Sequence, residues 1–196
     1  MGILNSAEQS PKMDKYNFIG QGLAAEVIAE RYGITREDVD KLSAESHAKA
    51  AAARENGWFK NEIAPIEVYT EDGGTKIFSE DECIRPGTTV EKLSQLKPVF
   101  KEDGIIHAGN SSQISAGASA LMIMSGEKCK ELGITPKFRV VAHSVIGTDP
   151  HAMLEGPIPS TKMALKKAGL SINDIGVYEV NEAFAPVPLA WLKELD

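Results

Sequence analysis

The chain has 196 residues, 42% hydrophobic and 25% charged, a balance typical of a globular protein with one large domain or two small ones. Its formal net charge of −7 argues against nucleic-acid binding through bulk electrostatics, and no apolar run is long enough to span a membrane. Two cysteines without a spacing pattern, Cys83 and Cys129, favour a reducing compartment, which we expect to be the cytoplasm.

The N-terminal third predicts a loop followed by two helices. Residues 1–19 have little periodicity and predict an irregular segment. Apolar residues recur at helical spacing over residues 23–32, and Gly33 is placed to end that helix. Thr35 with acids behind it predicts the cap of a second helix over residues 35–54. The faces of both helices, taken alone, favour a plain scaffold.

A hairpin and a short helix are predicted next. Residues 62–69 and 76–79 alternate apolar and polar side chains around a turn at residues 71–74, which is typical of a hairpin. A short helix follows over residues 90–96 and ends before Pro98.

The run from His107 to Ser125 carries two different signals. Residues 109–117 are small and polar, so their backbone can approach a ligand and their side chains can form hydrogen bonds with it. Residues 118–124 are small and apolar, which predicts an element buried on both faces. Composition alone leaves a ligand site and a plain loop entering the core equally open.

The C-terminal third alternates helices with strands. A helix capped by Ser125 is predicted over residues 125–133, and a second helix over residues 160–169. Residues 138–143 and 174–180 are predicted strands, the latter delivering Asn181 at its carboxyl end. This alternation predicts an α/β fold.

Three motifs resemble those of one enzyme family. GNSSQIS at residues 109–115, followed by an alanine-rich run, resembles the GN-S/A-S-x-x-x-DGA-A segment of thiolases, which cleave or form 3-ketoacyl-CoA thioesters. VNEAFA at residues 180–185 resembles their NEAFA motif, and GPIP at residues 156–159 their GxGPxPA segment. GQGLAAE at residues 20–26 is similar to the start of a thiolase helix. Ala116 departs from the pattern, standing where the family has aspartate.

The resemblance covers nearly the whole chain and implies a partial thiolase fold, a layered αβαβα architecture with an inserted α+β loop domain. It implies that residues 1–99 form the loop domain that caps CoA. Residues 100–136 would end the N-terminal half-domain, and residues 137–196 would start the C-terminal one. A sheet that remains unfinished exposes an edge and an apolar face, so we expect the isolated chain to self-associate.

Thiolases use a nucleophilic cysteine, a GHP histidine and a second cysteine in a CxGxG segment, and none of these motifs occurs in the chain. We interpret Cys83 and Cys129 as ordinary cysteines. No metal site is predicted, because the histidines do not fall at ligand spacing. We therefore expect an internal fragment that does not turn over by itself.

The resemblance also implies site residues. Asn181 matches the asparagine that orients a catalytic water in an oxyanion hole, although it could instead cap a helix beginning at Ala183. Arg85 matches an arginine at the adenine-phosphate end of CoA. Ser112 matches a serine that binds the pantetheine amide, with Ile114 beside it. The positions that match the lining of the pantetheine tunnel are Phe100, Ala183 and Phe184.

We expect Ser112 and Asn181 to converge on one cleft shaped for a pantetheine arm. The first hypothesis is a segment of a thiolase-type acyl-CoA acyltransferase in the β-oxidation of fatty acids or steroid side chains. The alternatives are a non-catalytic CoA- or acyl-binding protein of thiolase descent and a scaffold that kept only the fold. Acyl-CoA is the expected substrate, with no tightly bound cofactor, no nucleic-acid or membrane partner, and a homodimer or homotetramer in the full-length family.

Overall fold

The computed structural model describes residues 15–196, so most of the loop predicted over residues 1–19 lies outside the described residues. The helices are α3 (Gln21–Arg31), α4 (Arg36–Glu55), α5 (Val90–Ser94), α6 (Gly126–Glu131), α7 (Pro157–Ala168) and α8 (Pro186–Leu195), with 3₁₀ turns η1 (Met153–Glu155) and η2 (Ile172–Asp174). Strands β1 (Ile66–Tyr69) and β2 (Thr75–Phe78) form an antiparallel hairpin. None of the helices over residues 15–196 combines the length and apolar character needed to cross a bilayer.

The structure confirms the predicted end of α3 at Gly33 and the predicted start of α4 at Thr35. Gly33 adopts a φ of 57° just after α3, a left-handed conformation that favours glycine. The Thr35 side chain accepts the N–H of Asp38, and the Asp38 carboxylate accepts the N–H of Thr35, which forms a capping box at the start of α4. The capping box satisfies N–H donors that would otherwise lack partners within the helix.

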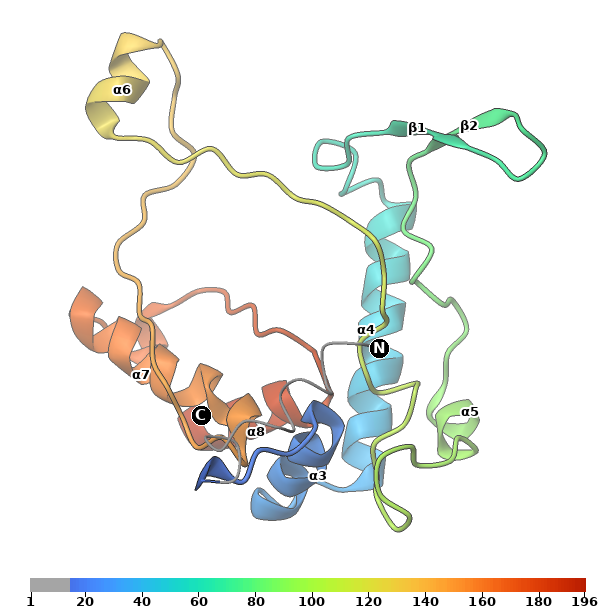
Figure 1. Ribbon diagram of the computed structural model, residues 1–196. Helices are drawn as coiled ribbons and strands as arrows, with labels where there is room; N and C mark the ends of the chain where they lie inside the picture. Colours follow the sequence, from blue (N-terminus) through green and yellow to red (C-terminus); the bar gives the residue numbers. More distant parts are fainter. Residues whose placement is uncertain (1–14) are drawn as a thin grey trace.

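The main core joins the beginning of the described chain to its end. Helix α3 packs against α8 and η1, and α7 also contacts α8. The larger buried cluster contains Ile28, Ala29, Ile34, Val39, Ile158, Ala185, Ala190 and Trp191. A second cluster of Ala25, Ile106, Phe184 and Val187 lies where the residues before the polar turn meet the start of α8. Figure 1 shows this compact part, with α4 rising from it towards the hairpin.

The hairpin is confirmed, with Ile66 opposite Phe78 and Tyr69 opposite Thr75. It lies at the far end of α4 from the core (Figure 1). The following helix α5 is shorter than predicted, since it ends at Ser94. Helix α6 begins as predicted, because Ser125 accepts the N–H of Lys128. Helix α7 begins at Pro157, three residues before the predicted start at Ser160, because the fixed φ of proline suits the first helical turn.

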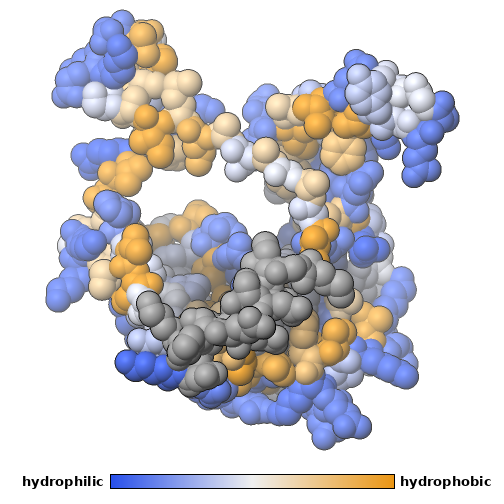
Figure 2. All heavy atoms as spheres, in the orientation of Figure 1, coloured by the Kyte–Doolittle hydropathy of each residue, from blue (hydrophilic) through white to orange (hydrophobic). Residues whose placement is uncertain are grey.

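Three apolar segments have no regular structure: residues 113–124, 135–149 and 175–182. The strands predicted over residues 138–143 and 174–180 are therefore wrong for this structure, as is the predicted burial of residues 118–124. Leu121, for example, is 91% exposed. A strand forms only when a neighbour supplies backbone partners, and no backbone hydrogen bond within residues 15–196 pairs these segments with one another. Figure 2 shows hydrophobic side chains on the two arms that lead to and from α6, which residues 113–124 and 135–149 form.

Candidate functional site

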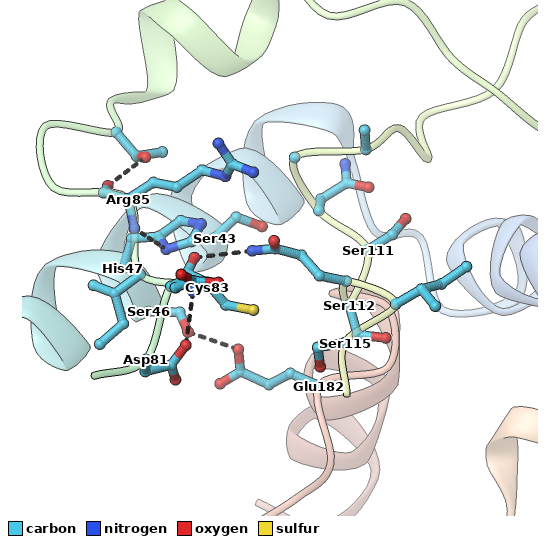
Figure 3. Close-up of a pocket in the computed structure, with 18 of the residues that line it drawn as sticks. Ser43, Ser46, His47, Asp81, Cys83, Arg85, Ser111, Ser112, Ser115 and Glu182 are labelled. Carbon is cyan, nitrogen blue, oxygen red and sulfur yellow. Dashed lines mark hydrogen bonds between the residues drawn. The ribbon is translucent and has the colours of Figure 1, made fainter. Parts of the chain in front are cut away.

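A cleft of about 1520 Å³ lies between α4, the hairpin, the loop at residues 81–88 and the polar turn at residues 108–116. Figure 3 shows polar side chains from all of these elements except the hairpin pointing into it, together with Glu182. Most small-molecule sites have volumes of roughly 300–1,000 Å³. The cleft therefore has room for a long ligand.

One wall of the cleft is a face of α4 that carries Ser43, Ser46 and His47. Ser46 Oγ donates a hydrogen bond of 2.8 Å to Glu182 Oε2, which ties the wall to the segment before α8. Sequence reasoning missed these four residues. The three on α4 fall at positions i, i+3 and i+4, so helical spacing was the available signal.

Arg85 stands on the loop beside this wall, and its backbone N–H and carbonyl are both hydrogen-bonded. Its N–H donates to His47 Nδ1 at 3.3 Å, and its carbonyl accepts from Thr88 Oγ1 at 2.8 Å. None of the ion pairs within residues 15–196 involves its guanidinium. No lysine and no other arginine lines the cleft in the described part of the chain, so Arg85 is the cation available there to an anionic ligand.

Ser112 and Ile114 lie on the polar turn and line the same cleft as Arg85. The Ser112 N–H donates to the Ala183 carbonyl at 2.9 Å, and the Gln113 side chain donates to the Cys83 carbonyl at 2.9 Å. The turn is thus attached to the segment before α8 and to the Arg85 loop. The Ile114 side chain is fully exposed and free to contact a ligand.

Phe100, Ala183 and Phe184 lie beside the cleft rather than in its lining. The Phe100 and Phe184 rings meet edge to face with centroids 5.9 Å apart, and Phe184 is buried. Phe100 covers Gly22 of α3 so closely that a Cβ there would overlap the ring. In this structure the two rings pack in the core beside the cleft, with Phe184 in the buried cluster that contains Ile106.

Asn181 does not share the cleft with Ser112. It is exposed and lines a separate cavity of about 230 Å³ with Ser144, Ser160 and Trp191. Successive side chains of an extended segment point to opposite sides, so Glu182 enters the cleft while Asn181 faces away. The predicted convergence of Ser112 and Asn181 is therefore wrong for this structure.

The helix-cap interpretation of Asn181 is also wrong, because α8 begins at Pro186 and its N-cap residue is Ala185. The catalytic role of Asn181 stays a prediction. Cys83 lines the cleft and is partly buried, whereas Cys129 is buried on α6. Within residues 15–196, no three His, Cys, Asp or Glu side chains gather in a way that could hold a metal ion.

Behind the polar turn lies a buried hydrogen-bonded pair, His107 and Asp40, that sequence reasoning missed. His107 Nε2 is 2.7 Å from Asp40 Oδ1, and both side chains are almost completely buried. Burial is the main cause that lowers the pKa of His107 below its ordinary value, and the hydrogen bond to Asp40 partly opposes it. The positive charge of Arg36, which pairs with Asp40, lowers the pKa of His107 further. His107 is thus neutral near pH 7.

Acidification below about pH 6.5 is expected to destabilise the region around His107. The pKa of His107 in the folded chain lies below the ordinary value of 6.5, so the unfolded chain takes up the proton first as pH falls. The stabilisation that the neutral His107 gives the folded chain is complete above about pH 6.5 and is lost as pH falls through the pKa of His107 in the folded chain. Thermal melting can be followed by tryptophan fluorescence between roughly pH 5 and 8. The melting temperature should fall more steeply with decreasing pH for the wild type than for His107→Phe. Equal slopes would contradict this assignment.

Comparisons with known proteins identify the family of the chain. Residues 5–127 match the thiolase N-terminal domain, and residues 134–196 match the thiolase C-terminal domain. The chain is 47% identical over 192 residues to a 3-ketoacyl-CoA thiolase of Marinobacter nauticus, covering 96% of this chain and 49% of the relative. It is 50% identical over 175 residues to one of Escherichia coli K12, covering 89% and 45%.

Solved structures give the same result. The acetyl-CoA acetyltransferase of Bacillus anthracis superposes with a TM-score of 0.87 at 43% identity, covering 90% of this chain and 45% of that chain. Human mitochondrial 3-ketoacyl-CoA thiolase superposes with a TM-score of 0.85 at 44% identity, covering 89% and 44%. The chain thus spans about half the length of the relatives it matches. With both domain matches and this structural likeness, the chain belongs to the thiolase family and has a partial thiolase fold of the α/β class.

Proposed function

We propose that the cleft binds coenzyme A and that the chain contributes this surface to a thiolase-type acyl-CoA acyltransferase. The reaction is the thiolytic cleavage of 3-ketoacyl-CoA or the reverse Claisen condensation. The observation that carries the proposal is the position of Arg85, Ser112 and Ile114 in one cleft, although 27 residues or more separate the arginine from the other two in the sequence. The names of the relatives, 3-ketoacyl-CoA thiolase and acetyl-CoA acetyltransferase, support the substrate class.

Each part of CoA has a suitable partner in the cleft. The Arg85 guanidinium can pair with the phosphates and stack on the adenine. The Ser112 hydroxyl can bond an amide of the pantetheine arm, and the exposed Ile114 can cover its methylene groups. The Asp81 carboxylate also lines the cleft and accepts the N–H of Cys83 at 2.7 Å, which holds it against its own loop.

Asn181 is proposed to orient a water in the oxyanion hole of the complete enzyme, a role that rests on its place in the VNEAFA motif. The chain by itself is proposed not to turn over, since its two cysteines stand outside the motifs that supply the family nucleophiles. The proposed setting is a homo-oligomeric enzyme of fatty-acid or steroid side-chain β-oxidation in the cytoplasm.

Arg85→Ala is expected to weaken CoA binding by about tenfold or more, because a charge-assisted hydrogen bond contributes roughly 1.5–3 kcal/mol. Isothermal titration of the full 196-residue chain with CoA measures the loss. Arg139→Ala, which removes an exposed arginine outside the cleft, is the matched control and should bind as the wild type does. Absence of CoA binding by the wild type at millimolar concentration would refute the proposed site.

A thiolysis assay with acetoacetyl-CoA separates the two remaining interpretations. The first expected result is that this chain binds CoA but does not turn over acetoacetyl-CoA. The second is that a complete thiolase with the same cleft turns it over and loses this activity when its equivalent arginine is replaced. Together these results would support the acyltransferase segment. Binding that has no effect on turnover in such an enzyme would favour a non-catalytic CoA-binding protein of thiolase descent.

A further inference from the structure

Three polar or charged side chains form a hydrogen-bonded network that connects α4 to the back of the polar turn. Arg36 Nε pairs with Asp40 Oδ2 at 2.8 Å, and Asp40 Oδ1 lies 2.7 Å from His107 Nε2. Arg36 Nη2 donates to the carbonyls of Leu93 and Leu96 at 2.7 and 2.8 Å. Neither Arg36, Asp40 nor His107 lines the cleft, so none of them touches a ligand there.

The residues of the turn are held by hydrogen bonds to His107. His107 Nδ1 accepts the Gly109 N–H at 3.0 Å, so Nε2 carries the proton and donates it towards Asp40. The Asn110 side chain accepts the His107 N–H at 2.9 Å and donates to the Ile105 carbonyl at 2.9 Å. Ser111 Oγ donates to the His107 carbonyl at 2.9 Å. The residue before Ser112 is thus bonded directly to His107.

Arg36 also fixes the surface on which Gly109 rests. A Cβ added at Gly109 would lie 2.5 Å from Leu93 Cδ2 and 2.8 Å from Leu96 Cδ1, so the turn packs tightly against the end of α5. The two carbonyls that Arg36 holds belong to these same leucines. A single guanidinium therefore positions both the imidazole, through Asp40, and the leucines that contact Gly109.

We propose that Arg36, Asp40 and His107 are positioning residues that hold the turn at residues 109–112 in the geometry needed to bind the pantetheine arm. Buried, fully bonded polar networks favour one arrangement over its alternatives. A buried carboxylate that loses a partner is strongly destabilised, so the network resists rearrangement. This inference rests on the proposed CoA site and predicts a selective effect on one end of the ligand.

The test uses the full chain with two probes, CoA and adenosine 3′,5′-bisphosphate, which lacks the pantetheine arm. Asp40→Asn keeps the side-chain shape but can no longer accept from both Arg36 and His107. It is expected to weaken CoA binding about tenfold while the bisphosphate binds within twofold of the wild type. Glu45→Gln, on the exposed side of the same helix, is the matched control and should change neither affinity.

The outcomes separate the two proposals. If the wild type binds neither probe, the CoA site itself is wrong, and the positioning role falls with it. If the wild type binds both and Asp40→Asn loses both in parallel, or loses neither, only the positioning role is overturned. Long-range proton–nitrogen spectra give an independent measurement. The wild-type His107 is expected as the neutral Nε2–H tautomer, and an Nδ1–H tautomer would contradict the network.

Discussion

Replacing Glu26 by alanine is expected to speed hydrogen exchange at the amides of Ile105 and Ile106 about 100-fold. The Glu26 side chain is buried on α3, with 4% exposure of the residue. Its Oε1 accepts the N–H of Ile106 at 2.8 Å, and both oxygens lie 3.0 Å from the N–H of Ile105. A hydrogen bond to a charged acceptor contributes roughly 1.5–3 kcal/mol, and 1.4 kcal/mol corresponds to a factor of ten.

The loss of protection from hydrogen exchange should extend to the cleft, because Ile106 belongs to the buried cluster beneath the polar turn. Exchange mass spectrometry of peptides over residues 104–112, at low protein concentration, measures both effects. Glu26→Gln keeps one acceptor oxygen and should fall between the wild type and Glu26→Ala. Glu30→Ala is the matched control, since Glu30 is exposed on the same helix and pairs with Lys101. Unchanged protection at Ile105 and Ile106 in Glu26→Ala would show that the carboxylate does not hold this segment.

Local signals explain which elements could be predicted from the sequence. The Thr35 cap, the Gly33 terminus and the Ser125 cap each act within a few residues of themselves, so α3, α4 and α6 followed directly. The segment at residues 138–143 has the composition of a strand, but strand formation depends on a neighbour that composition does not reveal. The strand prediction for residues 138–143 was therefore wrong, whereas the predictions of the capped helices were correct.

The same distinction applies to the site. Arg85 and Ser112 could both be assigned to a CoA site because the family resemblance identified each of them separately. The contact between Asp40 and His107 joins residues 67 positions apart, and neither stands in a recognisable motif. Asn181 shows the opposite limit, because a correct motif does not determine towards which side an extended backbone turns the side chain. Family membership does not depend on that convergence, since it rests on both domain matches and on the solved structures.

The isolated chain is expected to self-associate at micromolar concentration, and Leu121→Lys with Val141→Lys is expected to weaken that association by a factor on the order of ten or more. Leu121 is 91% exposed and Val141 is 60% exposed, on two segments that lack backbone partners within the described chain. Burying one such side chain contributes about 1.5–3 kcal/mol, and an unpaired extended backbone is a template for pairing with a second chain. A lysine at each site opposes both processes by adding a charge that resists burial.

Sedimentation velocity across a concentration series measures the association. Tyr69→Lys is the matched control: Tyr69 is 90% exposed, but its backbone already pairs with Thr75 in the hairpin. If exposed apolar area alone drives association, this control should weaken it as much as either single substitution does. If unpaired backbone is required as well, only the substitutions in residues 113–124 and 135–149 should act. A wild-type chain that remains monomeric throughout the series would mean that these segments find partners within their own chain in solution, contrary to their open arrangement in the structure.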